Sequence, residues 1–186
     1  GEPTYRRKRG PVKLTPFTAA PSPDISAFAA RGGKLVHYHG WNDAVVPPDG
    51  SIAYLYALTQ FERLRSLPKA EFDREVDKLT PQQVASTGEG YLDKVKQYHR
   101  LFMLPAMGHC TQPTSGPSAI GGGANEPPDQ YRTSDHHAVN AAIKWVEQGV
   151  APDRIIASRF DTNGKAMRQR PVCAYPAEAV YKGSGD

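Results

Sequence analysis

Cysteine and long apolar runs are scarce in this 186-residue chain, and each shortage excludes a class of protein. Two cysteines, Cys110 and Cys173, are too few for a small disulfide scaffold and too far apart for a zinc knuckle. They permit one internal bridge, or two bridges to another polypeptide. No stretch approaches the ~18 consecutive apolar residues of a membrane span. The N-terminus also lacks the apolar run of a signal peptide, so we expect it to be a cut within a longer polypeptide.

Outside one short basic cluster, the chain has almost no excess of charge of either sign. The chain has 23 Lys and Arg against 19 Asp and Glu, a formal net charge of +4. Four of these basic residues are consecutive, from Arg6 to Arg9, and they fit either a solvated tail or a protease recognition site. A nucleic-acid binder usually keeps a whole basic face with interleaved aromatic residues. We therefore expect neither a nucleic-acid nor a membrane partner.

Glycine and proline are abundant, with 17 of each, while hydrophobic residues make up only 39% of the chain. This composition predicts a loop-rich chain with a thin core, and the length suits about one domain. Residues 1–25 contain prolines and a basic run without a clear period, so they are expected to form a linker or arm. Residues 26–186 are expected to form the domain, with a helical insertion at 60–97 and a long loop at 111–134.

Three apolar runs bounded by turn residues predict buried strands, at 34–39, 100–104 and 154–159. Helices are predicted between them. Residues 24–31 form a short helical turn, 49–65 form a longer helix with Asp49 as its N-cap, and a third helix runs from its cap, Asp135, to a stop at Gly149. The buried face of the third helix is expected to comprise Val139, Ala142, Ile143 and Val146. The chain after the third strand is expected to be irregular.

Alternating strands and helices are typical of a parallel sheet with crossover helices, so the predicted class is α/β. In such sheets functional groups gather beyond the carboxyl ends of the strands. Asp43 follows the first strand, four residues after His39, and His109 follows the second, five residues after Leu104. A carboxylate there fixes the tautomer of the imidazole, whose other nitrogen then acts as a base. The order Asp then His is also the second half of the Ser, Asp, His order of α/β-hydrolases.

Five local strings carry a more specific signal than this pair. They are GKLVHYHGWND at 33–43, RLFMLPAMGHC at 100–110, WVEQGVAPDR at 145–154, RPVCAYP at 170–176 and YKGSGD at 181–186. In this order they resemble the C-terminal part of the tannase and feruloyl esterase family. The resemblance covers residues 25–186, with departures in length at 60–97 and 111–134. It implies the C-terminal portion of an α/β-hydrolase fold, incomplete without its N-terminal half.

The resemblance also implies roles for single residues. Asp43 is the triad acid and His109 the triad base. Cys110 forms a disulfide with a cysteine directly before the nucleophilic serine, which would hold nucleophile and base in register. Cys173 resembles a second structural cysteine whose partner is elsewhere, and a buried free thiol is its alternative.

The nucleophile expected of this family is missing from the chain. The sequence contains neither Gly-x-Ser-x-Gly after a strand nor Cys-Ser before a helix, and Ser115 and Ser118 follow His109 too closely to form a nucleophile elbow. We therefore expect the serine, the oxyanion hole and the substrate-selecting lid on a companion chain or a missing N-terminal half. The structural calcium often found in that lid would belong there too, and no cofactor is expected in this chain.

Other residues have two interpretations. Trp41 would line the acyl pocket or plug the core beneath the loop. His37 and His39 alternate on one face of the first strand, and packed or hydrogen-bonded histidines are favoured over a direct role. His136 and His137 are adjacent, so on a helix they point about 100° apart, and no metal site is expected.

The predicted function is hydrolysis of carboxylic esters, with aromatic-acid esters of the gallate or hydroxycinnamate type as substrates. A serine from the absent segment would attack the ester with help from His109 and Asp43. The alternative is a non-catalytic subunit or binding module that retains the hydrolase scaffold. Disulfides rarely persist in the cytosol, so a secreted or periplasmic location is expected.

Overall fold

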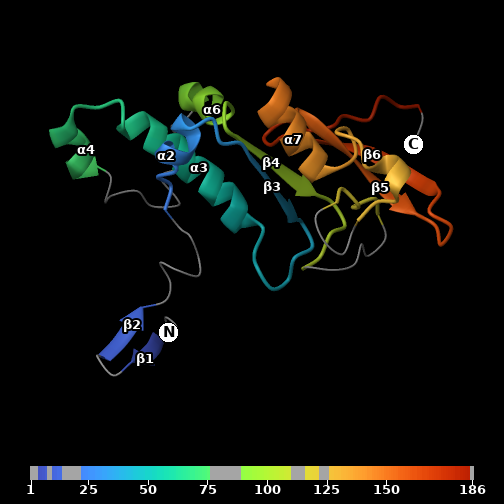
Figure 1. Ribbon diagram of the computed structural model, residues 1–186, viewed down its shortest axis with the longest axis horizontal. Coiled ribbons are helices and arrows are strands. Elements are labelled where there is room, and N and C mark those ends of the chain that lie inside the picture. Colours follow the sequence, from blue (N-terminus) through green and yellow to red (C-terminus); the bar gives the residue numbers. More distant parts are fainter. Residues whose placement is uncertain are drawn as a thin grey trace.

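The computed structural model describes residues 4–7, 10–13, 22–75, 89–109, 116–121 and 126–184. Its centre is a pair of parallel strands, β3 (Leu35–Gly40) and β4 (His99–Leu104), which lie side by side in Figure 1. Their register pairs Leu35 with His99 at one end and Gly40 with Leu104 at the other. Two of the three predicted strands are thereby confirmed, and so is the class α/β.

Strand β4 is buried on both of its faces, as a central parallel strand is expected to be. Leu101 and Met103 belong to one core cluster, and Phe102 and Leu104 belong to another. This alternation follows from the two-residue period of a strand. It places β4 between two layers of helices and loops.

The first layer is formed by α3 (Asp49–Leu64) and α6 (Glu89–Val95), which contact each other. Leu55 and Leu58 of α3 pack with Val95 and the residues of β4 that face them. Helix α3 confirms the prediction of a helix at 49–65. The predicted N-cap is wrong, because Asp49 is the first helical residue and the N-cap is Pro48, without a side-chain capping hydrogen bond. Two short helices, α2 (Ser26–Ala30) and α4 (Lys69–Glu75), precede and follow α3.

The second layer includes α7 (Ala138–Gln148), on the other side of the β3–β4 pair in Figure 1. The predicted stop is confirmed, since Gly149 adopts the left-handed conformation with φ 71°. The predicted cap is wrong, because His137 is the N-cap and its side chain accepts a hydrogen bond from the Asn140 N–H.

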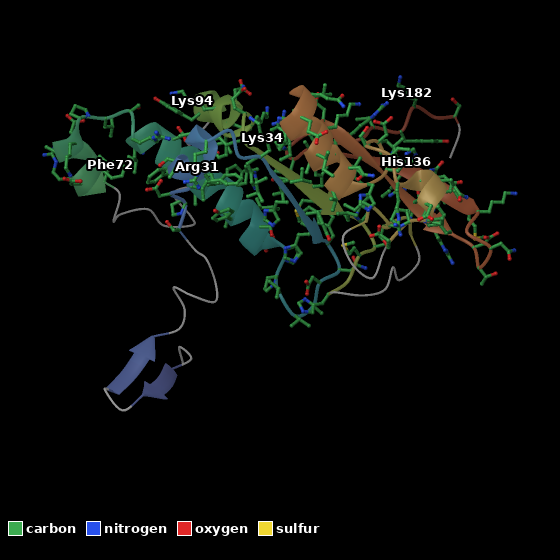
Figure 2. The ribbon with its side chains drawn as sticks, in the orientation of Figure 1. Arg31, Lys34, Phe72, Lys94, His136 and Lys182 are labelled. Atoms are coloured by element: carbon green, nitrogen blue, oxygen red, sulfur yellow. The ribbon has the colours of Figure 1, made fainter. Side chains whose placement is uncertain are left out.

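The predicted buried face of α7 is also wrong. The buried residues are Ala138, Ala141 and Trp145, whereas Val139, Ile143 and Val146 are exposed. Small side chains let the helix approach the strands closely, and the Trp145 ring fills the remaining space beneath two cations. Lys34 Nζ lies 5.4 Å and Arg100 Cζ 5.2 Å from the centre of that ring, and Lys34 is labelled in Figure 2.

The third predicted strand exists but does not extend the parallel sheet. Strand β5 (Arg154–Phe160) pairs antiparallel with β6 (Ala166–Cys173), in the segment expected to be irregular. Strand β6 pairs with β5 through backbone hydrogen bonds, and some of its exposed residues are charged. Its sequence therefore lacks the apolar run from which a strand is predicted. The chain after β6 then reaches β4, where Ala174 forms a bridge with Phe102 and the Tyr175 N–H donates to the Leu101 carbonyl.

The remaining elements lie in segments that were expected to be irregular or inserted. Within the expected arm at 1–25, β1 (Thr4–Arg7) and β2 (Gly10–Lys13) form an antiparallel hairpin, drawn apart from the other elements in Figure 1. The expected insertion at 60–97 takes in the end of α3 together with α4 and α6. The described part of the expected loop at 111–134 includes one turn of 3-10 helix, η2 (Asp129–Tyr131). In the parts of the chain that the structure describes, no helix is long and apolar enough to cross a membrane.

One buried residue of β4 makes the fold sensitive to acid. His99 is 1% exposed, and both of its ring nitrogens lack a hydrogen-bond partner among the described residues. Burial, helped by the nearby His37 and Arg100, lowers the pKa of His99 to about 3. As pH falls below about 6.5, the ordinary pKa of histidine, His99 binds a proton in the unfolded chain but stays neutral in the folded protein. Folding stability is therefore lost between about pH 6.5 and pH 3.

The substitution His99→Leu should remove this acid sensitivity. From the shift in pKa, His99 alone costs the wild type about 2 kcal/mol of unfolding free energy between pH 7 and pH 5. Urea titrations at the two pH values should show a smaller loss for His99→Leu. The buried neighbour variant Leu101→Ala is the control, because it should lower stability equally at both pH values. An unchanged pH dependence in His99→Leu would contradict the prediction.

Candidate active site

Asp43 lies in the turn that follows β3, and local hydrogen bonds hold its side chain. Oδ1 accepts from the backbone N–H of Val45 at 2.9 Å and from that of Val46 at 2.8 Å. The short Asp side chain commonly caps its own turn in this way. The Asp43 side chain is only 7% exposed, which leaves Oδ2 in a fixed position at the carboxyl end of the strand.

The segment between β4 and His109 passes very close to the end of β3. The Trp41 N–H donates to the Leu104 carbonyl at 2.9 Å, and the Asn42 N–H donates to the Met107 carbonyl at 3.0 Å. Gly40 permits this approach, since a Cβ at that position would collide with the Met107 carbonyl oxygen. The intervening Ala106 takes a left-handed conformation with φ 60°, which turns the chain towards His109. Because residue 40 is a glycine, the loops that carry Asp43 and His109 can lie close together.

The two predicted site residues meet directly. Nδ1 of His109 lies 2.8 Å from Oδ2 of Asp43, although 66 residues separate them in the chain. Burial raises the pKa of the Asp43 carboxyl, but hydrogen bonds from Val46, His109 and Val45, with the charge of His109, lower it by more. Its pKa lies well below the ordinary value, so the carboxyl is ionised at neutral pH and only accepts hydrogen bonds.

This charge decides which nitrogen of His109 carries the proton. Because Asp43 Oδ2 is an acceptor, Nδ1 is the protonated nitrogen in the neutral ring and Nε2 presents its lone pair. The His109 side chain is 39% exposed, and Nε2 has no partner among the described residues. An imidazole fixed in this tautomer by a carboxylate is arranged as a general base.

A second histidine, His39, also contacts Asp43. Its Nε2 lies 3.3 Å from Asp43 Oδ2 and 3.1 Å from the Val46 carbonyl oxygen, and its Nδ1 lies 2.6 Å from Ser51 Oγ. Ser51 Oγ is in turn 3.0 Å from Nε2 of His37. Sequence reasoning favoured packed or hydrogen-bonded histidines at both positions over a direct role. It missed Ser51, because a serine in the first turn of the following helix has no periodic relation to the strand.

Trp41 does not plug the core, as one of its two interpretations required. It is 45% exposed and lines a groove of about 910 Å³. The other walls come from the ends of β4 and β6 and from the C-terminal segment, and they include Met103, Pro105, Cys173, Tyr175 and Tyr181. Lys182, labelled in Figure 2, belongs to the same lining. An aromatic surface thus begins two residues before Asp43.

The predicted disulfides cannot be located within this structure. Cys110 lies outside the described residues, and Cys173, at the end of β6, is half-buried and free. Pairing of Cys173 with a cysteine beyond this chain remains a prediction.

The adjacent histidines His136 and His137 lie just before α7, with His137 as its N-cap, and both have structural partners. His137 Nε2 lies 2.8 Å from a carboxylate oxygen of Glu126, and His136 Nδ1 lies 3.0 Å from Thr133 Oγ1. His136 is labelled in Figure 2. Over the described ranges, no group of three or more His, Cys, Asp or Glu side chains is placed to hold a metal ion.

Parallel strands with Asp and His beyond their carboxyl ends, linked by a crossover helix, define part of an α/β-hydrolase-like domain. Comparison with known proteins gives the same class. The family model described as tannase and feruloyl esterase matches residues 3–186, so the chain belongs to the tannase and feruloyl esterase family.

Individual relatives are much longer than this chain. It is 38% identical over 187 residues to an uncharacterized esterase of Xanthomonas campestris, covering 97% of this chain and 29% of that protein. It is 30% identical to a probable feruloyl esterase B-1 of Neosartorya fischeri, covering 87% of this chain and 25% of the relative. The crystal structure of feruloyl esterase B from Aspergillus oryzae superposes with a TM-score of 0.62 at 27% identity, over 88% of this chain and 27% of that one.

The close approach at Gly40 gives a test of the site's construction. In Gly40→Ala the new methyl group would collide with the Met107 carbonyl, so the two loops must separate. We expect the free energy of unfolding to fall by about 1–3 kcal/mol. We also expect a shift in the proton resonance of His109 Nδ1–H. Urea titration and NMR of the native protein measure both quantities.

A matched control is available in the first turn of α3. A Cβ at Gly50 would meet nothing within 4 Å, so Gly50→Ala should be neutral or stabilising by up to about 1 kcal/mol. Equal effects of the two substitutions would show that the approach at residue 40 does not constrain the site.

Proposed function

We propose that the native protein hydrolyses carboxylic esters of aromatic acids through a Ser-His-Asp triad. In this proposal the present chain supplies Asp43 as the acid and His109 as the base. The observation that carries it is the 2.8 Å contact between His109 Nδ1 and Asp43 Oδ2 beyond two adjacent parallel strands. The family to which the chain belongs, and the esterases among its relatives, support the same reaction class.

The chemistry follows from the tautomer that Asp43 selects. A serine hydroxyl placed at His109 Nε2 would attack the ester carbonyl while Nε2 accepts its proton. The Asp43 carboxylate stabilises the imidazolium that forms, without itself taking the proton. His109 then protonates the departing alcohol, leaving an acyl-enzyme. Water activated by the same nitrogen releases the aromatic acid and restores the serine.

We place the serine outside the 186 residues of this chain, on a preceding segment or a companion polypeptide. Ser51 is held between two histidines, Ser158 Oγ accepts from Gln169, and Ser118 is fully buried. In the described part of the chain, no serine hydroxyl is hydrogen bonded to His109. The chain spans only 29% and 25% of the two relatives reported above, which leaves room for such a segment.

The aromatic character of the substrate is supported by the groove at Trp41. An exposed indole beside the acid loop, with Tyr175 and Tyr181 farther along the lining, suits a planar acyl group. The groove would take the acid side of the ester. Relatives named feruloyl esterase are consistent with this choice.

The remaining parts of the proposal concern groups outside this chain. Cys110 and Cys173 would each bond a cysteine of the absent segment, Cys110 next to the nucleophile. Such bonds require an oxidising compartment, so the protein would be secreted or periplasmic. A structural calcium, if the native protein has one, would lie in the absent lid, and this chain would need no cofactor.

A fluorophosphonate probe and an aromatic ester test the reaction class together. The native preparation should hydrolyse methyl ferulate or methyl gallate, and the probe should label a serine outside this chain. His109→Ala should abolish both turnover and labelling, since the base is gone. His136→Ala is the control and should change neither. A preparation that binds these esters without hydrolysing or labelling would indicate a binding module instead.

Asp43→Asn should lower kcat by about 10⁴-fold, the size of the effect when a triad acid can no longer fix the base tautomer. The control is Asp161→Asn. Asp161 Oδ1 also accepts two backbone N–H bonds in a turn, both 2.9 Å long, but it contacts no histidine. Asp161→Asn should retain wild-type turnover. A kcat for Asp43→Asn within tenfold of wild type would remove Asp43 from the triad.

A further inference from the structure

The turn that carries Asp43 is held by a histidine other than the predicted base. His39 Nε2 lies 3.1 Å from the carbonyl oxygen of Val46 and 3.3 Å from Oδ2 of Asp43. The N–H of the same Val46 donates to Oδ1 of Asp43. His39 therefore contacts both ends of the turn, from residue 43 to residue 46, and does so with a single nitrogen. Its side chain is 12% exposed and enters the site from the end of β3.

The partners of His39 determine its tautomer. A carbonyl oxygen and an ionised carboxylate only accept hydrogen bonds, so Nε2 must carry the proton. In the neutral ring Nδ1 then has a lone pair, and the Ser51 hydroxyl donates to it across 2.6 Å. The Ser51 hydroxyl hydrogen points to His39, so the Ser51 oxygen accepts a hydrogen bond from His37 Nε2–H at 3.0 Å. Every donor in the series points the same way, from His37 towards Asp43.

The inner end of this series is kept neutral by its surroundings. Burial, with the nearby His39 as a smaller cause, lowers the pKa of His37 to about 4. The His37 ring also meets the rings of His99 and Tyr54 edge-on, with centroids 5.6 and 6.5 Å away. Ser51 is 8% exposed, in the first turn of α3. The series thus joins β3, α3 and the Asp43 turn, three adjoining parts of the chain in Figure 1.

We propose that His39 is a positioning residue for the triad acid, with Ser51 and His37 fixing its tautomer. Its Nε2–H holds the Val46 carbonyl and faces Asp43 Oδ2, so the carboxylate keeps one orientation while His109 gains and loses a proton. The catalytic consequence rests on the function proposed above, whereas the tautomer of His39 does not.

Two amide substitutions separate this role from simple packing. In His39→Gln the side-chain amide reaches the position of Nε2 and keeps a donor for Val46 and Asp43. In His39→Asn the amide reaches only the position of Nδ1, so it keeps a partner for Ser51 and loses the donor. We expect kcat to stay within about threefold of wild type for Gln and to fall roughly 10- to 100-fold for Asn, with KM little changed. His136→Gln and His136→Asn are the matched controls and should both retain wild-type kcat.

Equal losses of kcat in the Gln and Asn variants would overturn the proposal, because a packing role does not depend on which nitrogen position is filled. A change confined to KM would overturn it as well. Melting temperatures of both variants show whether a loss of kcat reflects unfolding. The kinetic comparison uses the native protein, including the polypeptide that carries the serine.

NMR of the native protein labelled with ¹⁵N-histidine tests the proposal without any turnover or substitution. The nitrogen shifts of His39 should show a protonated Nε2 and an unprotonated Nδ1. A protonated Nδ1 with a bare Nε2 would refute the inference even in an active esterase. The predicted tautomer in a protein without esterase activity would instead refute the proposed function and leave the positioning of Asp43 standing.

Discussion

The site depends on the parallel pairing of β3 with β4. At one end of this pair, Gly40 has no side chain, and this allows the segment after β4 to approach closely. The register fixes Gly40 opposite Leu104. The segments that follow the two strands stay side by side, because the N–H groups of Trp41 and Asn42 donate to the carbonyls of Leu104 and Met107. Asp43 and His109 are then one turn beyond a common edge, and their contact follows from the backbone.

A single ionised carboxylate organises the polar groups around it. Two backbone N–H groups fix one oxygen of Asp43, and two imidazoles, His109 and His39, lie near the other. An acceptor that cannot donate forces a proton onto the nitrogen of each ring that faces it. The charge on Asp43 therefore selects the tautomers of His109 and His39. The tautomer of His37 then follows through Ser51.

Sequence reasoning succeeded where a short pattern determined the structure. The apolar runs at 34–39 and 100–104 become β3 and β4, and the topology of parallel strands brings Asp43 to His109. It failed on α7, because Val139, Ile143 and Val146 form the more apolar stripe in the sequence, whereas the helix packs through Trp145 and the small Ala138 and Ala141. It failed on β6 because an outer strand pairs through its backbone and exposes charged side chains. Gly40 and Ser51 were missed because their importance lies in contacts with distant segments.

The register of β3 and β4 is held by main-chain hydrogen bonds, and this has a consequence for how the family can diverge. The chain leaves β3 at Gly40 and returns at His99, and the site needs only that these two ends meet. Loop-closure entropy grows slowly, so doubling the length of a flexible connection costs only about 0.6 kcal/mol. Segments such as α4, at the far end of α3 in Figure 1, can thus be lengthened, shortened or replaced at little energetic cost. The contact between Asp43 and His109 is insulated from that variation, which leaves the connection free to acquire new surfaces.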